Sequence, residues 1–96
     1  MGMNMNQLMK QAQQMQKKMQ EAQAELETKN FTATSGGGAV SATVSGKRTL
    51  TALAINPEVI DAEDAEMLQD LIIVAVNDAF AQVDAEMAKN MPQGMF

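Results

Sequence analysis

The chain has 96 residues, a net charge of −5, ten Met, and no Cys, His, Trp or Tyr. A chain of this length forms one domain with a modest core. Without Cys, disulfides and thiolate metal sites are excluded, and without Cys, His or Tyr few groups remain for acid–base or nucleophilic catalysis. We therefore expect no enzyme, no cofactor, no metal site and no small-molecule substrate.

The charges are divided unequally between the two halves of the chain. Residues 1–48 carry six basic and three acidic side chains, whereas residues 49–96 carry one basic and nine acidic side chains. A polyanion is therefore expected to approach the first half and to be repelled by the second. The longest apolar run, residues 71–76, is too short to span a bilayer, so we expect no membrane association and a cytoplasmic location.

A helix is predicted over about residues 5–28, with Asn4 or Asn6 as its N-cap. Its apolar residues are separated alternately by three and four positions, which is the heptad spacing of paired helices. Met and Ala on this seam are too weak to stabilise an isolated helix, so a partner is required. The predicted seam consists of Met5, Leu8, Ala12, Met15, Met19, Ala22 and Leu26.

Three short strands are predicted over about residues 30–35, 39–45 and 49–55, joined by turns at 36–38 and 45–48. The alternation of apolar and polar residues predicts a half-buried, antiparallel three-stranded meander. In the third strand it places Leu53 and Ile55 on one face and Leu50, Ala52 and Ala54 on the other.

A second helix is predicted over about residues 62–89, capped by Asp61, and residues 90–96 are expected to form a flexible tail. The acidic residues near its start, 61–66, complement the helix dipole and lack the spacing of a calcium loop. Its middle is apolar nearly all round, so Leu71 and Val74 are expected in the core or in a dimer seam.

The first helix is longer than the sheet on which it could rest. At 1.5 Å per residue it measures about 34 Å, against about 20 Å for a short meander. Part of it must project or pair with another helix. The predicted fold is thus an α+β, α-β-β-β-α protomer in a homodimer.

The ordered set of segments resembles the YbaB/EbfC family of bacterial nucleoid-associated proteins. The segments that carry the resemblance are residues 8–16, Gly38-Ala39-Val40, residues 44–46, Ile55-Asn56-Pro57, residues 68–71 and residues 75–79. Asn56 stands where the family usually has Asp, and Gln69 where it usually has Glu. The resemblance implies sheets joined across a dimer, long helices that project like tweezer arms, and a single domain over residues 1–89. It further implies DNA binding, coating of the nucleoid and an influence on gene expression.

Candidate DNA-binding residues lie on the first helix and in the second turn. Lys10 and Lys17 fall about 180° from the seam, and Lys18 falls on its flank. For the helix lysines, the alternative is a solvated face with weak ion pairs to Glu21. For Lys47 and Arg48, the alternative is a turn that only increases solubility. The predicted contacts to DNA phosphates are Lys10, Gln13, Gln14, Lys17, Lys18, Lys47 and Arg48.

The sequence therefore predicts a nucleoid-associated, cytoplasmic homodimer that binds duplex DNA through backbone phosphates with little sequence specificity. An alternative is a protein-interaction adaptor, accessory to DNA repair or replication, without strong DNA binding of its own. Acidity and the small number of basic residues favour this alternative.

Overall fold

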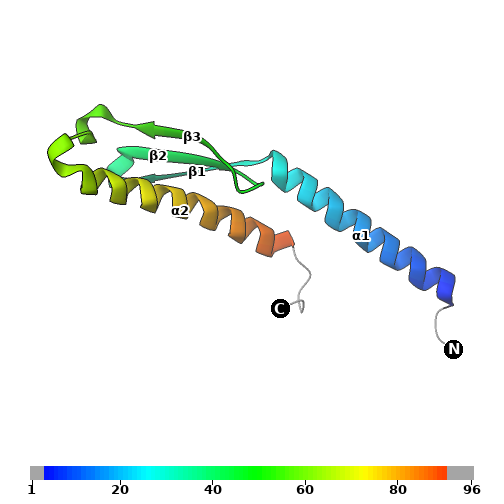
Figure 1. Cartoon of the computed structure of the whole chain (residues 1–96). Coiled ribbons are helices and arrows are strands. Elements are labelled where there is room, and N and C mark those ends of the chain that lie inside the picture. Colours follow the sequence, from blue (N-terminus) through cyan, green and yellow to red (C-terminus); the bar gives the residue numbers. More distant parts are fainter. Residues whose placement is uncertain (1–3, 91–96) are drawn as a thin grey trace.

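The computed structural model describes residues 4–90 as an elongated α+β protein with extents of 74 × 23 × 16 Å (Figure 1). The elements are α1 (Met5–Thr28), β1 (Asn30–Ser35), β2 (Val40–Ser45), β3 (Leu50–Ile55) and α2 (Ala65–Asn90). This order confirms the predicted α-β-β-β-α protomer and its projecting first helix. The tail predicted from residue 91 onward lies outside the described residues.

Helix α1 extends away from the rest of the molecule (Figure 1). Its N-cap is Asn4, whose side-chain oxygen accepts a hydrogen bond from the backbone N–H of Gln7 at 2.9 Å. Glu, Gln and Lys, which favour helices, fill most of its polar positions. Within α1 only Leu26 is buried, so the predicted need for a partner is not met among residues 4–90.

The sheet has the strand order β1-β2-β3 and is antiparallel throughout. Val40, Ala42 and Val44 of the central strand are fully buried beneath α2. A β-bulge leaves Thr51 without a partner, because Thr43 pairs with Ala52 and Val44 pairs with Leu50. The prediction that Leu50 shares a face with Ala52 and Ala54 is therefore wrong: the bulge sets Leu50 opposite Val44.

The β1–β2 turn is a 3-10 turn over Gly36–Gly38. All three glycines have positive φ, at 62°, 68° and 95°, a region that side chains with a Cβ rarely adopt. Gly36 also lies against the side chain of Leu71, so the turn is packed onto α2. The backbone conformation of this turn therefore favours glycine at all three positions.

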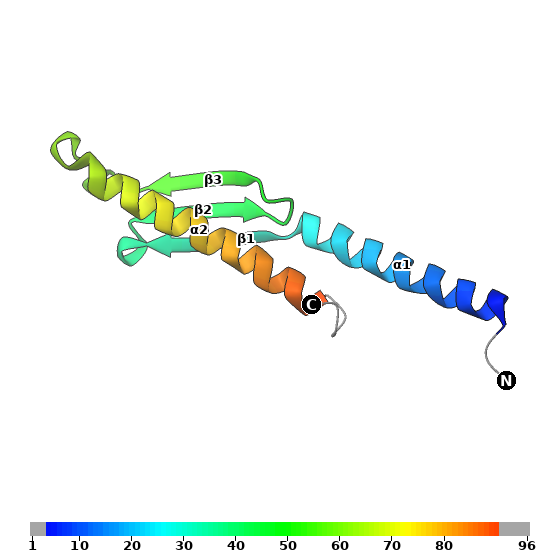
Figure 2. The ribbon, with the colours of Figure 1, turned by 60° about the horizontal axis from the view of Figure 1, so that its bottom comes forward.

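Helix α2 follows two 3-10 turns and lies diagonally across one face of the sheet (Figure 2). Asp61 caps the second turn by accepting from the N–H of Glu63 at 2.9 Å, and the α-helix begins at Ala65 instead of residue 62. Ala75, Ala79 and Val83 are fully buried against β1 and β2. Strand β3 is left largely uncovered, with Leu53 40% exposed.

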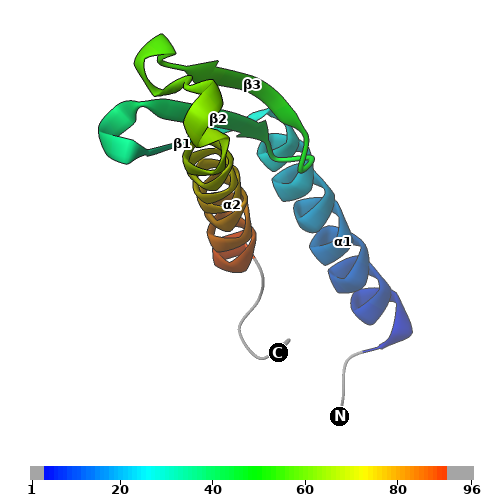
Figure 3. The ribbon, with the colours of Figure 1, turned by 60° about the vertical axis from the view of Figure 1, so that its left-hand side comes forward.

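The end of α1 is fixed to the β2–β3 turn. Leu26 is 5% exposed, and its backbone carbonyl lies so close to Gly46 that a Cβ at that position would overlap it. The N–H of Gly46 donates to the carbonyl of Lys29 at 3.1 Å. Beyond this attachment α1 and α2 leave the sheet as separate rods (Figure 3).

We expect Gly46→Ala to lower the free energy of unfolding by about 1–3 kcal/mol, because the added methyl group must displace the last turn of α1. Chemical denaturation followed by circular dichroism measures this change. Lys47→Ala in the same turn is the control, with an expected change within about 0.5 kcal/mol because Lys47 is exposed. An equal effect of the two substitutions would contradict the close approach of α1 to the turn.

Candidate nucleic-acid interface

The basic side chains of the first half follow α1 from its free end toward its base. Lys10, Lys17 and Lys18 are all exposed, and residues 4–20 contain no acidic side chain. At about 100° per residue, Lys10 and Lys17 lie on the side of α1 opposite the seam, with Gln13 and Gln14 on adjacent positions. The helix therefore presents one basic, amide-rich side and one apolar side.

The three lysines of α1 are available to a ligand in this structure. Within residues 4–90 the ion pairs join Lys29 to Glu86 and Arg48 to Asp84, so neither includes Lys10, Lys17 or Lys18. The weak pairs to Glu21 that were considered as an alternative are not formed. Exposed ammonium groups on a helix of this kind can reach successive phosphates of a polyanion.

The β2–β3 turn brings Lys47 and Arg48 to the base of α1, because Gly46 packs against the last turn of that helix. Lys47 is exposed, whereas the guanidinium of Arg48 donates a hydrogen bond to the carboxylate of Asp84. Arg48 has φ of 63°, an uncommon conformation for a residue other than glycine. Within residues 4–90 the turn thus adds Lys47, which forms no ion pair, and Arg48, whose charge Asp84 of α2 neutralises in part.

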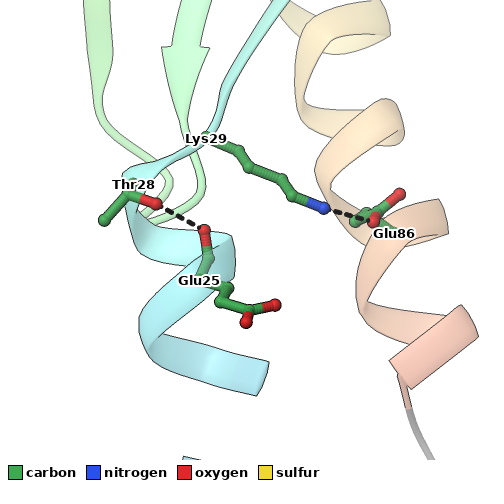
Figure 4. A network of polar contacts seen from close by, with 4 residues as sticks. All are labelled: Glu25, Thr28, Lys29 and Glu86. Atoms are coloured by element: carbon green, nitrogen blue, oxygen red, sulfur yellow. Dashed lines mark hydrogen bonds and ion pairs between the residues drawn. The ribbon is translucent and has the colours of Figure 1, made fainter. Parts of the chain in front are cut away.

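A second ion pair joins the base of α1 to the end of α2. The Lys29 ammonium donates to Oε1 of Glu86 at 2.8 Å (Figure 4). This hydrogen bond, together with the opposite charge, holds the pKa of Glu86 below its ordinary value and raises the pKa of Lys29 above its ordinary value. Both groups therefore stay charged through the neutral range, and the contact helps to hold α1 in place relative to α2.

The seven predicted DNA-binding residues lie in one half of the molecule, along α1 and at the turn beside its base. Sequence reasoning missed Lys29, Glu86 and Gly46, which set the position of α1. Lys29 and Glu86 are 57 residues apart, and no local pattern connects them. Gly46 was recognised only as a turn residue, since its packing against Leu26 is a tertiary contact.

The seam residues are divided between core and surface. Leu26 is buried and Leu71 is half-buried in the core, but Val74 is 48% exposed and the remaining α1 residues of the seam are exposed, except for half-buried Ala22. Within residues 4–90, acidic side chains do not gather into groups of three or more that could hold a metal ion. None of the helices described is both long and apolar enough to cross a membrane.

This arrangement agrees with comparisons against known proteins. A model of the YbaB/EbfC DNA-binding family matches residues 1–95. The chain belongs to the YbaB/EbfC DNA-binding family. Two nucleoid-associated proteins, from Clostridium acetobutylicum and Clostridium novyi, are 57% and 52% identical to it over 90 residues, which is 94% of this chain and 80% and 79% of theirs.

The fold is also found in a solved structure. The crystal structure of an uncharacterised protein from Helicobacter pylori matches with a TM-score of 0.78 and 27% identity, over 92% of each chain. The expectation drawn from the sequence segments, membership of the YbaB/EbfC family, is therefore confirmed. The family is described by DNA binding, and not by a reaction.

We expect Lys29→Gln to raise the pKa of Glu86 toward its ordinary value, because the substitution removes both the hydrogen bond and the positive charge. Carboxyl-carbon NMR titration measures this pKa. Lys89→Gln is the control, because Lys89 acts on Glu86 more weakly than Lys29 does. Equal shifts in the two variants would argue against the Lys29–Glu86 contact.

The same pair predicts the pH dependence of stability. The contribution of Glu86 is present above its unfolded-state pKa and is lost as the pH falls through its lower folded-state pKa. The contribution of Lys29 is present below its unfolded-state pKa and is lost as the pH rises through its higher folded-state pKa. The difference in stability between the native protein and Lys29→Gln should therefore be present at neutral pH and disappear in acid.

Proposed function

We propose that this protein binds duplex DNA as a homodimer, with Lys10, Lys17 and Lys18 of α1 contacting backbone phosphates. Gln13 and Gln14 donate to phosphate or sugar oxygens, and Lys47 and Arg48 add contacts at the base of α1. Binding through phosphates carries little sequence specificity. In the cell the protein then associates with the nucleoid in the cytoplasm and influences its organisation and gene expression.

The observation that carries this proposal is the basic side of α1, which is separated from the acidic side chains of α2 and of the turns before it. The three lysines are exposed on a helix that extends beyond the sheet, while most acidic side chains lie on α2 or on the turns before it (Figure 1). This separation lets a polyanion approach α1 without meeting the acidic half at close range. A net charge of −5 is therefore compatible with binding to DNA.

The aromatic residues within residues 4–90 do not support binding through stacked bases, and Phe96 lies outside the described residues. Helix α1 contains no aromatic side chain, and Phe31 and Phe80 pack against the core. Recognition of single strands uses aromatic side chains on which bases stack. Contacts to the backbone of a duplex are the interaction that exposed lysines and glutamines can make.

We expect the triple variant K10Q, K17Q and K18Q to bind unrelated duplex sequences more weakly, and by about the same factor for each. The slope of log affinity against log salt should fall by about 1 for each lysine that contacts a phosphate. Fluorescence anisotropy on two unrelated duplexes over a range of salt concentrations measures both quantities. Lys89→Gln, which removes a lysine from α2, is the control and should leave the slope unchanged.

The same titration distinguishes DNA binding from the adaptor alternative. If the native protein does not bind duplex DNA at low salt, DNA binding is excluded. The acidic surface formed by α2 and the turns before it then becomes the candidate surface for a protein partner. If the native protein binds and the triple variant binds equally well, α1 is excluded from the interface.

The proposed homodimer is supported by an exposed apolar surface on the β3 side of the molecule. Strand β3 pairs on one edge with β2, and its other edge has no strand partner within residues 4–90. Leu50 and Leu53 are exposed there, as is Ile73 of α2 at 55%. Ile73 shares a helix face with Val76, which packs in the same cluster as Ile55 of β3. A second copy would remove these side chains from water.

We expect Ile73→Glu to weaken the homodimer by at least about tenfold in dissociation constant, because burial of an unpaired carboxylate is unfavourable. Sedimentation equilibrium measures the constant, and circular dichroism checks the fold. Ala24→Glu on exposed α1 is the matched control and should leave the dimer intact. If Ile73→Glu dimerises as tightly as the native chain, the dimer surface lies elsewhere.

A further inference from the structure

Among the residues that the structure describes, the apolar side of α1 has no partner over most of its length. Met5, Leu8, Ala12, Met15 and Met19, which we call the α1 seam, are all exposed, with Met5 at 77% and Met15 at 57%. Their alternating spacing of three and four is the spacing by which a helix packs along another helix. The occupant that this seam requires is therefore an elongated surface that includes a helix.

The protein itself carries a surface of this kind on the side of β1. A shallow groove with a volume of about 590 Å³ runs between β1 and α2, and the amide of Gln82 crosses it to donate to the carbonyl of Thr32 at 3.0 Å. Exposed Val74 and Met67 precede Ala81 by seven and fourteen residues, so helical periodicity places them on the same side of α2 as the groove. We call this surface the β1–α2 groove; its lining residues are Thr32, Ala33, Thr34, Asp78, Ala81 and Ala85, with Gln82.

We propose that the α1 seam of one copy docks into the β1–α2 groove of a second copy. The groove cannot receive the α1 of its own chain, because Leu26 and Gly46 fix the base of α1 beyond the end of the sheet and the helix then points away from it (Figures 1 and 2). Any α1 that enters this groove therefore comes from another molecule.

Charge complementarity favours this occupant. Residues 4–20 of α1 have three lysines and no acidic residue, whereas the groove contains Asp78, and Asp70 lies two turns earlier on the same helix. Lys18, on the flank of the seam, is placed to meet these carboxylates when the seam is docked. A helix of the same charge as the groove would be repelled, as α2 of another copy would be.

The sizes of the side chains are also complementary. The seam offers long, flexible methionines, and Ala33, Ala81 and Ala85 are the short apolar side chains among the mostly polar residues that line the groove between β1 and α2. Methionine adapts its shape to irregular apolar surfaces. Burial of the seam would also supply the partner that a marginally stable, projecting helix needs.

Docking leaves the other surfaces of the protein free. Lys10 and Lys17 lie about 180° from the seam and still face solvent when the seam is covered. The β1–α2 groove lies at β1, across the sheet from the free edge of β3. The contact can therefore join copies without using the proposed dimer surface, and of the three proposed phosphate-binding lysines of α1 it uses only Lys18.

Cross-linking tests the proposal directly, because the native chain has no cysteine and each introduced thiol is unique. Met15→Cys and Ala81→Cys proteins are mixed without DNA and treated with a short bismaleimide, and linked peptides are identified by mass spectrometry. We expect links between positions 15 and 81. Gln20→Cys, on the outer side of α1, replaces Met15→Cys in the control and should give at least fivefold fewer links to position 81.

Other outcomes overturn the proposal. If links between two copies of position 15 predominate, the arms pair with each other; if position 81 links equally to 15 and 20, or to neither, the seam does not dock there. Asp78→Lys provides a second measurement on folded protein, since it should reduce the 15–81 links several-fold at low salt. Because no DNA is present, failure of this contact is distinct from failure of DNA binding.

Discussion

The position of α1 depends on the contact between Leu26 and Gly46. Helix α1 is anchored near its last turn, where Leu26 is buried against a glycine that has no side chain to block the approach. The hydrogen bond from Gly46 to Lys29 and the ion pair from Lys29 to Glu86 hold the same turn from two sides. Because Leu26 is the one buried residue of α1 among residues 4–90, these few residues determine in which direction the basic helix extends.

Because α1 is fixed only at its C-terminal end, the rest of the helix presents two different surfaces. Lysines and glutamines occupy one side and apolar residues the other, with Lys18 on the flank between them. Most acidic groups lie on α2 and on the turns before it. A chain with a net negative charge can therefore belong to a DNA-binding family and still present a locally basic surface.

Periodicity and turn chemistry were enough to predict the element order, the antiparallel meander, a cap at Asn4 or Asn6 and the projecting α1. These features are local, and spacing along the chain determines them. The bulge at Thr51, the 3-10 turn before Ala65 and the approach of Leu26 to Gly46 were not predictable, since each depends on a neighbour that the fold supplies. For the candidate interface, the sequence placed its lysines on one side of a helix but could not reveal the pairing of Arg48 with Asp84.

The exposed methionines of α1 have a chemical consequence. Met5, Met9, Met15 and Met19 are all open to solvent, whereas the buried apolar core of the domain is built from valine, alanine and leucine. Oxidants convert an accessible thioether into a polar sulfoxide, which disrupts methionine-rich surfaces, and reductases reverse the change. Oxidative stress would thus alter the apolar side of α1 before it damages the fold, and the damage could be repaired.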